Sequence, residues 1–276
     1  MGNCTYCGKP AGFLKRSHKE CKQRYNQGKS KVLSLLQNIV SEDVDIKTVI
    51  EEVRQVAKSS LIDDRNLKTL IINGWKRAVD KAFDDGILTE EEESRLSELK
   101  DHFSLSQEEL DDDGTFSKLV KGAVLRDVMD GKLPERVKID GTLPFNLQKK
   151  EKIIWVFQGV DYYEQKTRTH YVGGSRGVSI RIAKGVYYRV GAFKGQRVQT
   201  TETVHVDRGL LGVTNKHIYF SGSVKHFRIA YSKIVAFEPY SDGIGVQRDA
   251  QTAKPQTFVT GDGWFTYNLI VNLAQM

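Results

Sequence analysis

The clustering of the cysteines at the N-terminus constrains this chain more than any other feature. All three cysteines lie between Met1 and Cys21, and with one histidine they have the spacing C-x2-C-x10-H-x2-C. An odd, clustered set of thiols suits a metal site in a reducing compartment better than a disulfide framework. Zinc takes four sulfur or nitrogen ligands in a tetrahedron, so the spacing predicts a structural zinc site. The predicted ligands are Cys4, Cys7, His18 and Cys21.

The residues around this cluster suit a small fold held by a metal. Gly8 directly follows the first cysteine pair, where a tight turn around the metal needs backbone freedom. His18 and Cys21 are three residues apart, so a helix that begins there places both on one face. A segment of about 20 residues buries too little apolar surface to fold without a metal. The pattern resembles treble-clef zinc fingers, which implies a finger over residues 1–30.

The same residues allow a second interpretation, a doubly acylated membrane anchor that begins at Gly2 and Cys4. The myristoylation pattern requires Ser or Thr at the sixth position, where this chain has Tyr6. Palmitoylation would also remove Cys4 from the metal site. We therefore expect a metal at Cys4. The sequence has no apolar run long enough to span a bilayer and no secretory signal, so we expect a cytoplasmic protein.

The charges divide the chain into three blocks. Residues 1–31 carry a net charge of +7, residues 32–140 a net charge of −9, and residues 141–276 a net charge of +9. This pattern indicates three units. The basic residues of the finger could contact phosphates, so a nucleic-acid interface is an alternative function. Its candidate residues are Lys15, Arg16, Lys19, Lys22 and Arg24.

Apolar residues at helical spacing predict an all-helical domain over residues 31–140. Thr89 and Glu92 form a capping box that begins one helix. The segment from Asp85 to Leu110 resembles the tellurite-resistance TerB-like domains. The matching residues are Asp85, Gly86, Leu88, Glu91, Glu92, Phe103, Leu105, Glu109 and Leu110. The resemblance implies a helical, stress-related module without established catalysis, sometimes suggested to bind a divalent metal.

The acidic turn around Gly86 also invites a calcium interpretation. An EF-hand that used Gly86 as its sixth position would have Lys81 and Phe83 as the first and third ligands, and neither side chain supplies an oxygen. We therefore exclude an EF-hand and leave a weak cation site open. The acidic cluster is explained most simply by its favourable interaction with a helix N-terminus. We expect the run Asp111–Asp113 to be a solvated loop.

Beyond residue 141 the sequence alternates apolar and polar residues between glycine-containing turns, which predicts antiparallel strands. A final helix would follow Asp262 and place Phe265, Leu269 and Leu273 on one face. Residues 148–276 resemble the GRAM and pleckstrin-homology-like domains of bacteria. The resemblance rests on Thr214, Asn215, Ile218, Phe220, Ile229, Tyr231 and Ile234. It implies a β-barrel or sandwich closed by a C-terminal helix, with a surface for lipids, peptides or partner proteins.

Basic residues in the first half of this domain could form a surface for phosphate or anionic lipid. The candidates are Arg176, Arg181, Lys184, Arg189, Lys194 and Arg197. Alternation along a strand also places His205 and Asp207 on one face, as a hydrolase would need. No nucleophile motif accompanies this pair, so we expect no catalysis.

The sequence therefore predicts an α+β multidomain protein. Its parts are a zinc finger over residues 1–30, a TerB-like helical domain over 31–140, and a pleckstrin-homology-like β-domain over 148–276. The resemblances imply a bacterial adaptor, in a stress or phage response, that binds a protein partner or anionic lipid.

Overall fold

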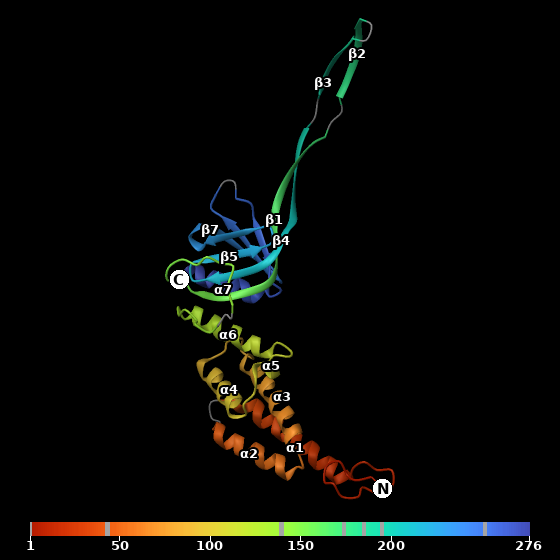
Figure 1. Ribbon diagram of the computed structural model, residues 1–276, viewed down its shortest axis with the longest axis vertical. Coiled ribbons are helices and arrows are strands. Elements are labelled where there is room, and N and C mark those ends of the chain that lie inside the picture. Colours follow the sequence, from red (N-terminus) through yellow and green to blue (C-terminus); the bar gives the residue numbers. More distant parts are fainter. Residues whose placement is uncertain are drawn as a thin grey trace. The chain divides into compact units, whose positions relative to one another are not determined.

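The computed structural model describes residues 2–41, 45–137, 141–172, 175–183, 186–193, 196–250 and 253–276, without the side chains of residues 167–200. The chain forms two compact units, Met1–Arg136 and Val137–Met276. Together they give a mixed α+β fold, with helices following an N-terminal Cys/His cluster and a curled antiparallel sheet carrying a C-terminal helix (Figure 1).

Helices make up the first unit beyond its N-terminal finger. Its elements are α1 (Lys19–Gln37), the short 3-10 helix η1 (Asn38–Val40), α2 (Ile46–Ser59), α3 (Asp64–Ala82), α4 (Glu90–His102), α5 (Gln107–Leu110) and α6 (Thr115–Met129). Helix α1 begins at the Cys/His cluster and ends among the other helices, so the boundary expected after residue 30 lies inside α1.

Side chains at the helix N-termini explain where the helices begin. Asp45 accepts a hydrogen bond from the backbone N–H of Thr48 at the start of α2. Thr89 and Glu92 form a capping box at α4, as the sequence predicts. Because Glu92 is engaged in this box, its carboxylate completes a helix cap.

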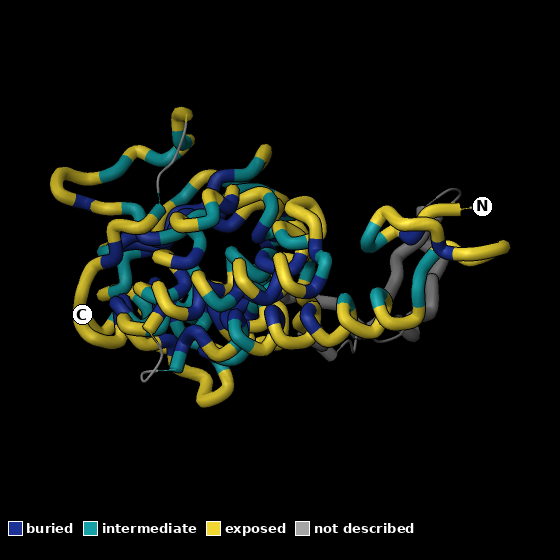
Figure 2. The backbone as a smooth tube through the Cα atoms, turned by 90° about the horizontal axis from the view of Figure 1, so that it is seen from below, coloured by how far each residue is buried: buried dark blue, intermediate teal, exposed yellow. Residues whose placement is uncertain are grey.

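The core of the first unit lies where α1 crosses α3. Gly74 of α3 lies against Leu36 of α1, and a Cβ atom at Gly74 would lie 2.6 Å from the Leu36 side chain. The neighbouring Trp75 is fully buried and donates from its indole nitrogen to the Leu96 carbonyl over 2.9 Å. Figure 2 shows that buried positions alternate with exposed ones along the helical coils. Close backbone approach at a glycine therefore sets the distance between α1 and α3.

The run Asp111–Asp113 lies in a turn where Asp112 and Asp113 are exposed, as expected, and its carboxylates also bond to neighbouring residues. Asp111 accepts hydrogen bonds of 2.7 Å from both the backbone N–H and the hydroxyl of Ser117. Asp113 accepts from the backbone N–H of Thr115, and the Lys76 ammonium lies 3.1 Å from the Asp113 carboxylate. These contacts join the α5–α6 connection to α3.

The second unit is a curled antiparallel sheet, or half-barrel, with the strand order β6-β5-β4-β1-β9-β8-β7 (Figure 1). Its strands are β1 (Ile153–Val172), β4 (Gln196–Thr214), β5 (His217–Gly222), β6 (His226–Ala230), β7 (Ile234–Pro239), β8 (Gly243–Arg248) and β9 (Gln256–Val259). Strands β2 (Ser175–Ala183) and β3 (Val186–Phe193) form a separate two-stranded sheet, and the 3-10 helix η2 (Tyr231–Lys233) precedes β7.

Aromatic side chains fill the inner face of this sheet. The rings of Tyr162, Phe220 and Phe258 are buried, and the Tyr162 ring lies about 5 Å from each of the other two. Helix α7 (Gly263–Gln275) begins at Asp262 and buries Phe265, Leu269 and Leu273, as the sequence predicts. The Phe265 ring lies 4.9 Å from that of Trp155. Helix α7 thus packs its apolar face against the sheet, whose edge strands are β6 and β7.

We predict that Gly74→Val lowers the free energy of unfolding of the first unit by about 2 kcal/mol, because the added methyl groups overpack the contact with Leu36. Urea denaturation followed by helical circular dichroism measures this loss. The control is Asn73→Val on the exposed side of α3, which we expect to change stability by less than about 0.5 kcal/mol. Equal effects at both positions would contradict the close contact.

Candidate metal centre and polar sites

The four predicted ligands come together at the N-terminus. The ligand atoms of Cys4, Cys7, His18 and Cys21 all lie within 4.8 Å of one another. His18 Nδ1 is 3.4 Å from the Cys7 sulfur and 3.7 Å from the Cys21 sulfur. A tetrahedral metal with ordinary zinc bond lengths would separate nitrogen and sulfur ligands by about 3.6 Å. The cluster can therefore hold a metal ion.

Local backbone structure positions the first cysteine pair. Asn3 and Pro10 form an antiparallel bridge, and the backbone N–H of Cys4 donates to the Lys9 carbonyl over 2.7 Å. Gly8 closes the turn between them with a φ of 70°, which a residue with a side chain rarely adopts. The turn directs both sulfurs to the same side.

The beginning of α1 positions the second pair of ligands. His18 is the N-cap residue of α1, and Cys21 lies in its first turn. His18 Nε2 lies 3.0 Å from the Pro10 carbonyl oxygen, which accepts its proton. In the neutral imidazole this bond places the proton on Nε2 and leaves Nδ1, which faces the Cys7 and Cys21 sulfurs, free to bind a metal.

The electrostatics of the cluster also favour a bound cation. Burial raises the pKa of the Cys4 thiol, but backbone N–H groups of His18, Cys7 and Tyr6 outweigh it and lower that pKa to about 6. Burial and the neighbouring thiols raise the pKa of Cys21 to about 11. Three thiolates this close repel one another, so their joint ionisation needs a positive charge between them. Among the residues that the structure describes, no other group of His, Cys, Asp and Glu has a geometry that could hold a metal.

The residues of the predicted nucleic-acid interface lie around this centre. Lys15 and Arg16 are exposed in the loop that leads to α1. Lys19 and Lys22 line a shallow hollow along α1 together with Asn26 and Ser30, whereas Arg24 does not line it. The structure therefore brings two of the five candidates to one surface of α1.

The predicted anion-binding residues of the β-domain fall outside the described side chains. Lys184 and Lys194 lie outside the described residues altogether. Arg176, Arg181 and Arg189 belong to β2 and β3, and Arg197 belongs to β4, but their side chains are not described. A basic surface at these positions stays a prediction.

The expectation that His205 and Asp207 lie on one face of a strand is wrong. A bulge in β4 pairs Tyr162 with Asp207 and Tyr163 with His205, so the alternation is broken between the two residues. His205 is exposed and lies 3.0 Å from the Asp161 carboxylate. Asp207 instead points to the turn after β5.

Asp207 has a structural role. Its carboxylate accepts hydrogen bonds of 2.7 Å from the backbone N–H groups of Val224 and Lys225, and one of 3.0 Å from the Ser223 hydroxyl. Burial raises the pKa of Asp207, but these donors and the N–H of Arg208 outweigh it and hold that pKa well below its usual range. Asp207 thus closes the β5–β6 turn.

Glu151, which the sequence analysis missed, is the second buried carboxylate of this unit. It accepts hydrogen bonds from Thr214, His217 and Tyr219, at 2.6, 2.8 and 2.8 Å. Burial raises the pKa of Glu151, but these donors and the backbone N–H of Gln148 lower it to about 2. The network joins the chain before β1 to the β4–β5 turn. Since its side-chain partners lie far along the chain, no local spacing could have revealed it.

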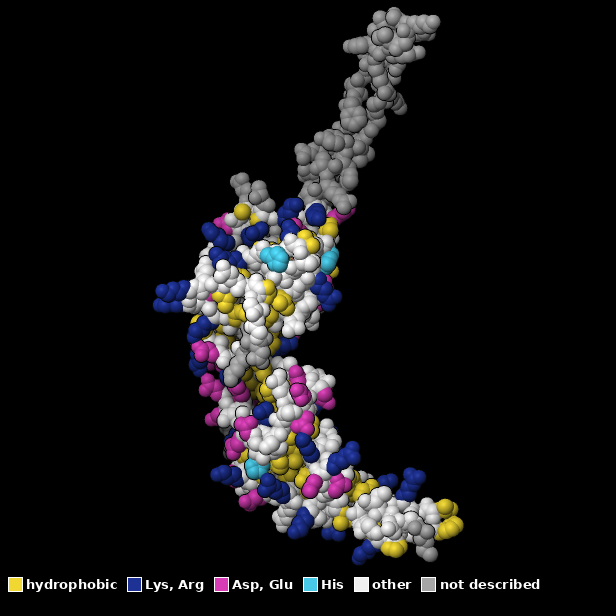
Figure 3. All heavy atoms as spheres, in the orientation of Figure 1, with side chains coloured by type: hydrophobic (Ala, Val, Ile, Leu, Met, Phe, Trp, Pro, Cys, Tyr) yellow, Lys and Arg dark blue, Asp and Glu magenta, His cyan; other side chains and the backbone are white. Residues whose placement is uncertain are grey.

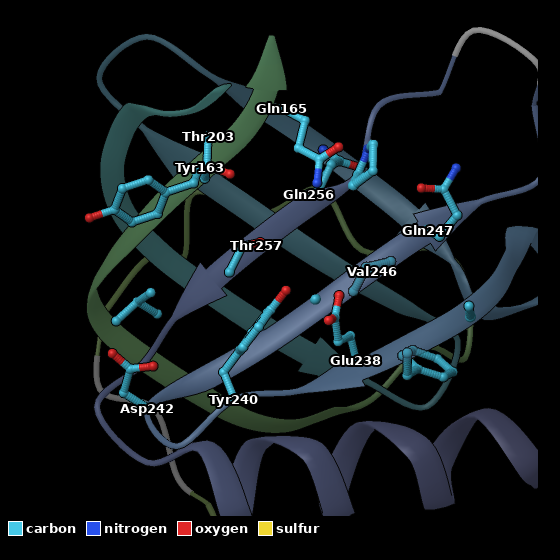
Figure 4. A pocket seen from close by; sticks show the side chains of 15 residues that line it. Tyr163, Gln165, Thr203, Glu238, Tyr240, Asp242, Val246, Gln247, Gln256 and Thr257 are labelled. Atoms are coloured by element: carbon cyan, nitrogen blue, oxygen red, sulfur yellow. The ribbon is translucent and has the colours of Figure 1, made fainter. Parts of the chain in front are cut away.

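A hollow of about 440 Å³ lies on a face of the sheet, over strands β1, β4, β7, β8 and β9 (Figure 4). Tyr163, Tyr240 and Thr257 line it, together with the carboxylates of Glu238 and Asp242. A hydrogen bond to Glu238, together with burial, raises the pKa of Tyr240. Within the described lining there is no Lys, Arg or His, so this hollow does not suit a phosphate or another anion.

Comparison of the sequence with models of known protein families finds no match, and comparison with curated proteins finds none. In the described part of the chain, no helix combines the length and the apolar character needed to cross a bilayer.

The two buried carboxylates predict an acid-labile second unit. A depressed folded-state pKa contributes stability above the unfolded pKa, and this contribution is lost as the pH falls through the folded pKa. The midpoint temperature of thermal unfolding of the second unit should therefore decrease as the pH is lowered from about 5 to about 2. Asp207→Asn should lower the midpoint at pH 7 by about 5 °C, because an amide nitrogen cannot accept hydrogen bonds from the N–H groups of the turn. The midpoint of this variant should also decrease less than that of the wild type when the pH is lowered. Differential scanning calorimetry measures both.

The control for this experiment is Asp249→Asn, which changes an exposed carboxylate of the same unit. We expect it to melt as the wild type does across the pH range. An Asp207→Asn variant with unchanged midpoint and unchanged acid dependence would show that Asp207 does not hold the turn.

Proposed function

We propose that this protein is a non-enzymatic adaptor whose N-terminal finger is stabilised by zinc. The Cys3His cluster carries the proposal, since its ligand atoms lie within 4.8 Å of one another and its histidine is oriented by Pro10. Three thiolates and one imidazole form a soft, tetrahedral set that suits zinc and that structural zinc sites use. All four protein ligands are present, so the site is closed in the manner of a structural site.

We further propose that the helices form a TerB-like module and the second unit a GRAM or pleckstrin-homology-like module. The support is the capping box at Thr89 and Glu92 after the Gly86 turn, and the half-barrel with helix α7 in the second unit. Such a combination fits a bacterial adaptor in a stress or phage response. The partner of this adaptor would be a protein or an anionic lipid, and the adaptor itself would be cytoplasmic.

The environment of the buried acidic groups supports a non-catalytic role. Asp207 is engaged by the β5–β6 turn, and Glu151 by its hydroxyl and histidine partners. Both carboxylates have depressed pKa values, which suits hydrogen-bond acceptors better than general acids near neutral pH. The absence of catalysis stays a prediction.

A second candidate function is nucleic-acid binding through the finger. The observation that favours it is the hollow along α1, which Lys19 and Lys22 line together. Two ammonium groups one helical turn apart could contact adjacent phosphates.

We predict about one zinc ion per chain, because the four ligands form a complete structural site. Elemental analysis of the purified full chain measures this content. Cys21→Ser should lower the zinc content and unfold the finger while the second unit melts at an unchanged temperature. The control Gln23→Ser, at an exposed position of the same helix, should retain its zinc. A finger that folds without metal would contradict the proposal.

We predict no binding to DNA or RNA tighter than about 1 µM at physiological salt, because the hollow along α1 offers only Lys19 and Lys22 as phosphate contacts. A gel shift repeated at increasing salt measures this affinity for the wild type and for Lys19→Glu/Lys22→Glu. The control is Lys149→Glu/Lys150→Glu, which changes two exposed lysines of the second unit. Tight, salt-dependent binding of nucleic acid that Lys19→Glu/Lys22→Glu loses and the control keeps would contradict the adaptor function. It would favour nucleic-acid binding through the finger.

A further inference from the structure

The loop between the two ligand pairs presents two bulky apolar side chains to solvent. Phe13 is 83% exposed and Leu14 is 88% exposed, more than any other large hydrophobic residue of the described chain. The pair is adjacent in sequence and lies in the finger, whose fold depends on metal ligands. Fully exposed neighbouring apolar side chains of this size indicate a surface that is covered in a complex.

The base of this loop is fixed on both sides. The backbone N–H of Ala11 donates to the Gly2 carbonyl over 2.9 Å, and that of Thr5 donates to the Arg16 carbonyl over 3.0 Å. Leu14 has a φ of 57°, a conformation that is rare for a bulky side chain. The fixed base therefore holds Phe13 and Leu14 outward, and Leu14 keeps an unfavourable backbone conformation of the kind found in strained functional loops.

The surroundings of the pair are cationic. Lys9, Lys15, Arg16 and Lys19 are all exposed, and the sequence from Met1 to Lys19 contains no Asp or Glu. Figure 3 shows hydrophobic side chains at the N-terminal end of the first unit, with Lys and Arg side chains nearby. The partner of this loop must accept apolar side chains and carry negative charge at the same place.

We propose that the Phe13–Leu14 loop inserts into the surface of an anionic lipid bilayer. A bilayer accepts protruding apolar side chains at the boundary of headgroups and acyl chains without a preformed pocket. Lys15 and Arg16, which directly follow the pair, then lie at the level of the lipid phosphates. A nucleic acid would have to unstack its bases to bury both side chains, so the bilayer fits the loop better.

This inference rests on the proposed adaptor function and places a lipid contact in the finger, in addition to the basic surface predicted for the β-domain. The hollow on the sheet is lined by Glu238 and Asp242 and would repel lipid phosphates. Two apolar side chains with a few cations give reversible binding, which suits a protein that needs a second contact for stable attachment.

The test is co-sedimentation of the zinc-loaded full chain with vesicles. One set of vesicles contains phosphatidylcholine and phosphatidylserine, and the other contains phosphatidylcholine alone. The loop variant is Phe13→Ser/Leu14→Asn, because asparagine tolerates the positive φ at position 14 and the finger should keep its fold. The control is Val224→Ser/Trp264→Ser, which removes two exposed apolar side chains from the second unit.

We expect the wild type to bind the anionic vesicles and the loop variant to bind them about a hundredfold more weakly. Lys15→Gln/Arg16→Gln should weaken binding about fivefold per charge removed. The control variant should bind as the wild type does, and binding to phosphatidylcholine alone should be much weaker.

The proposal would be overturned if the wild type did not bind anionic vesicles, or if the wild type and the loop variant bound them equally. Equal losses of vesicle affinity in the loop and control variants would also overturn it. Loop-dependent binding to DNA or RNA without vesicle binding would overturn it in favour of a nucleic acid. Zinc content is measured on every variant. If the variants contain zinc as the wild type does but the lipid proposal fails, the proposed metal site is unaffected. If the double variant loses its zinc, the single variant Phe13→Ser takes its place, and we expect it to bind anionic vesicles at least tenfold more weakly than the wild type. An unchanged affinity of Phe13→Ser for these vesicles would overturn the proposal.

Discussion

Helix α1 carries His18 at its N-cap and Cys21 in its first turn, and it places Leu36 against Gly74 in the helical core. One continuous helix therefore belongs to the metal centre and to the core at the same time. A metal bound to the four ligands fixes the first turn of α1 relative to the Cys4–Cys7 turn. The orientation of the finger in the first unit follows from this shared helix, and so does the direction in which the loop with Phe13 and Leu14 points.

The proposed metal ligation would also explain why the finger can expose its apolar residues. In a fold of this size, bonds to a metal replace much of the free energy that a hydrophobic core would supply. Cys4 and Ala11 are buried, whereas Phe13 and Leu14 are not needed inside. Apolar side chains that folding does not require are available for binding.

The features that the sequence predicts correctly are those with a local signal. The ligand spacing predicts the Cys3His cluster, the capping box predicts the start of α4, and the apolar face of α7 follows from helical periodicity. The features that it misses depend on contacts between distant residues. A bulge in β4 separates His205 from Asp207, the partners of Glu151 come from β4 and β5, and the hollow on the sheet combines five strands. Alternation along one strand contains no information on a bulge, because the partner strand determines the register.

The central claim is that Cys4, Cys7, His18 and Cys21 hold one zinc ion, with His18 binding through Nδ1. X-ray absorption at the zinc edge of the purified full chain tests it most directly, because it counts sulfur and nitrogen ligands around the metal. We predict three sulfur ligands at about 2.3 Å and one nitrogen ligand at about 2.0 Å. A shell dominated by oxygen, or one with fewer than three sulfur ligands, would contradict it.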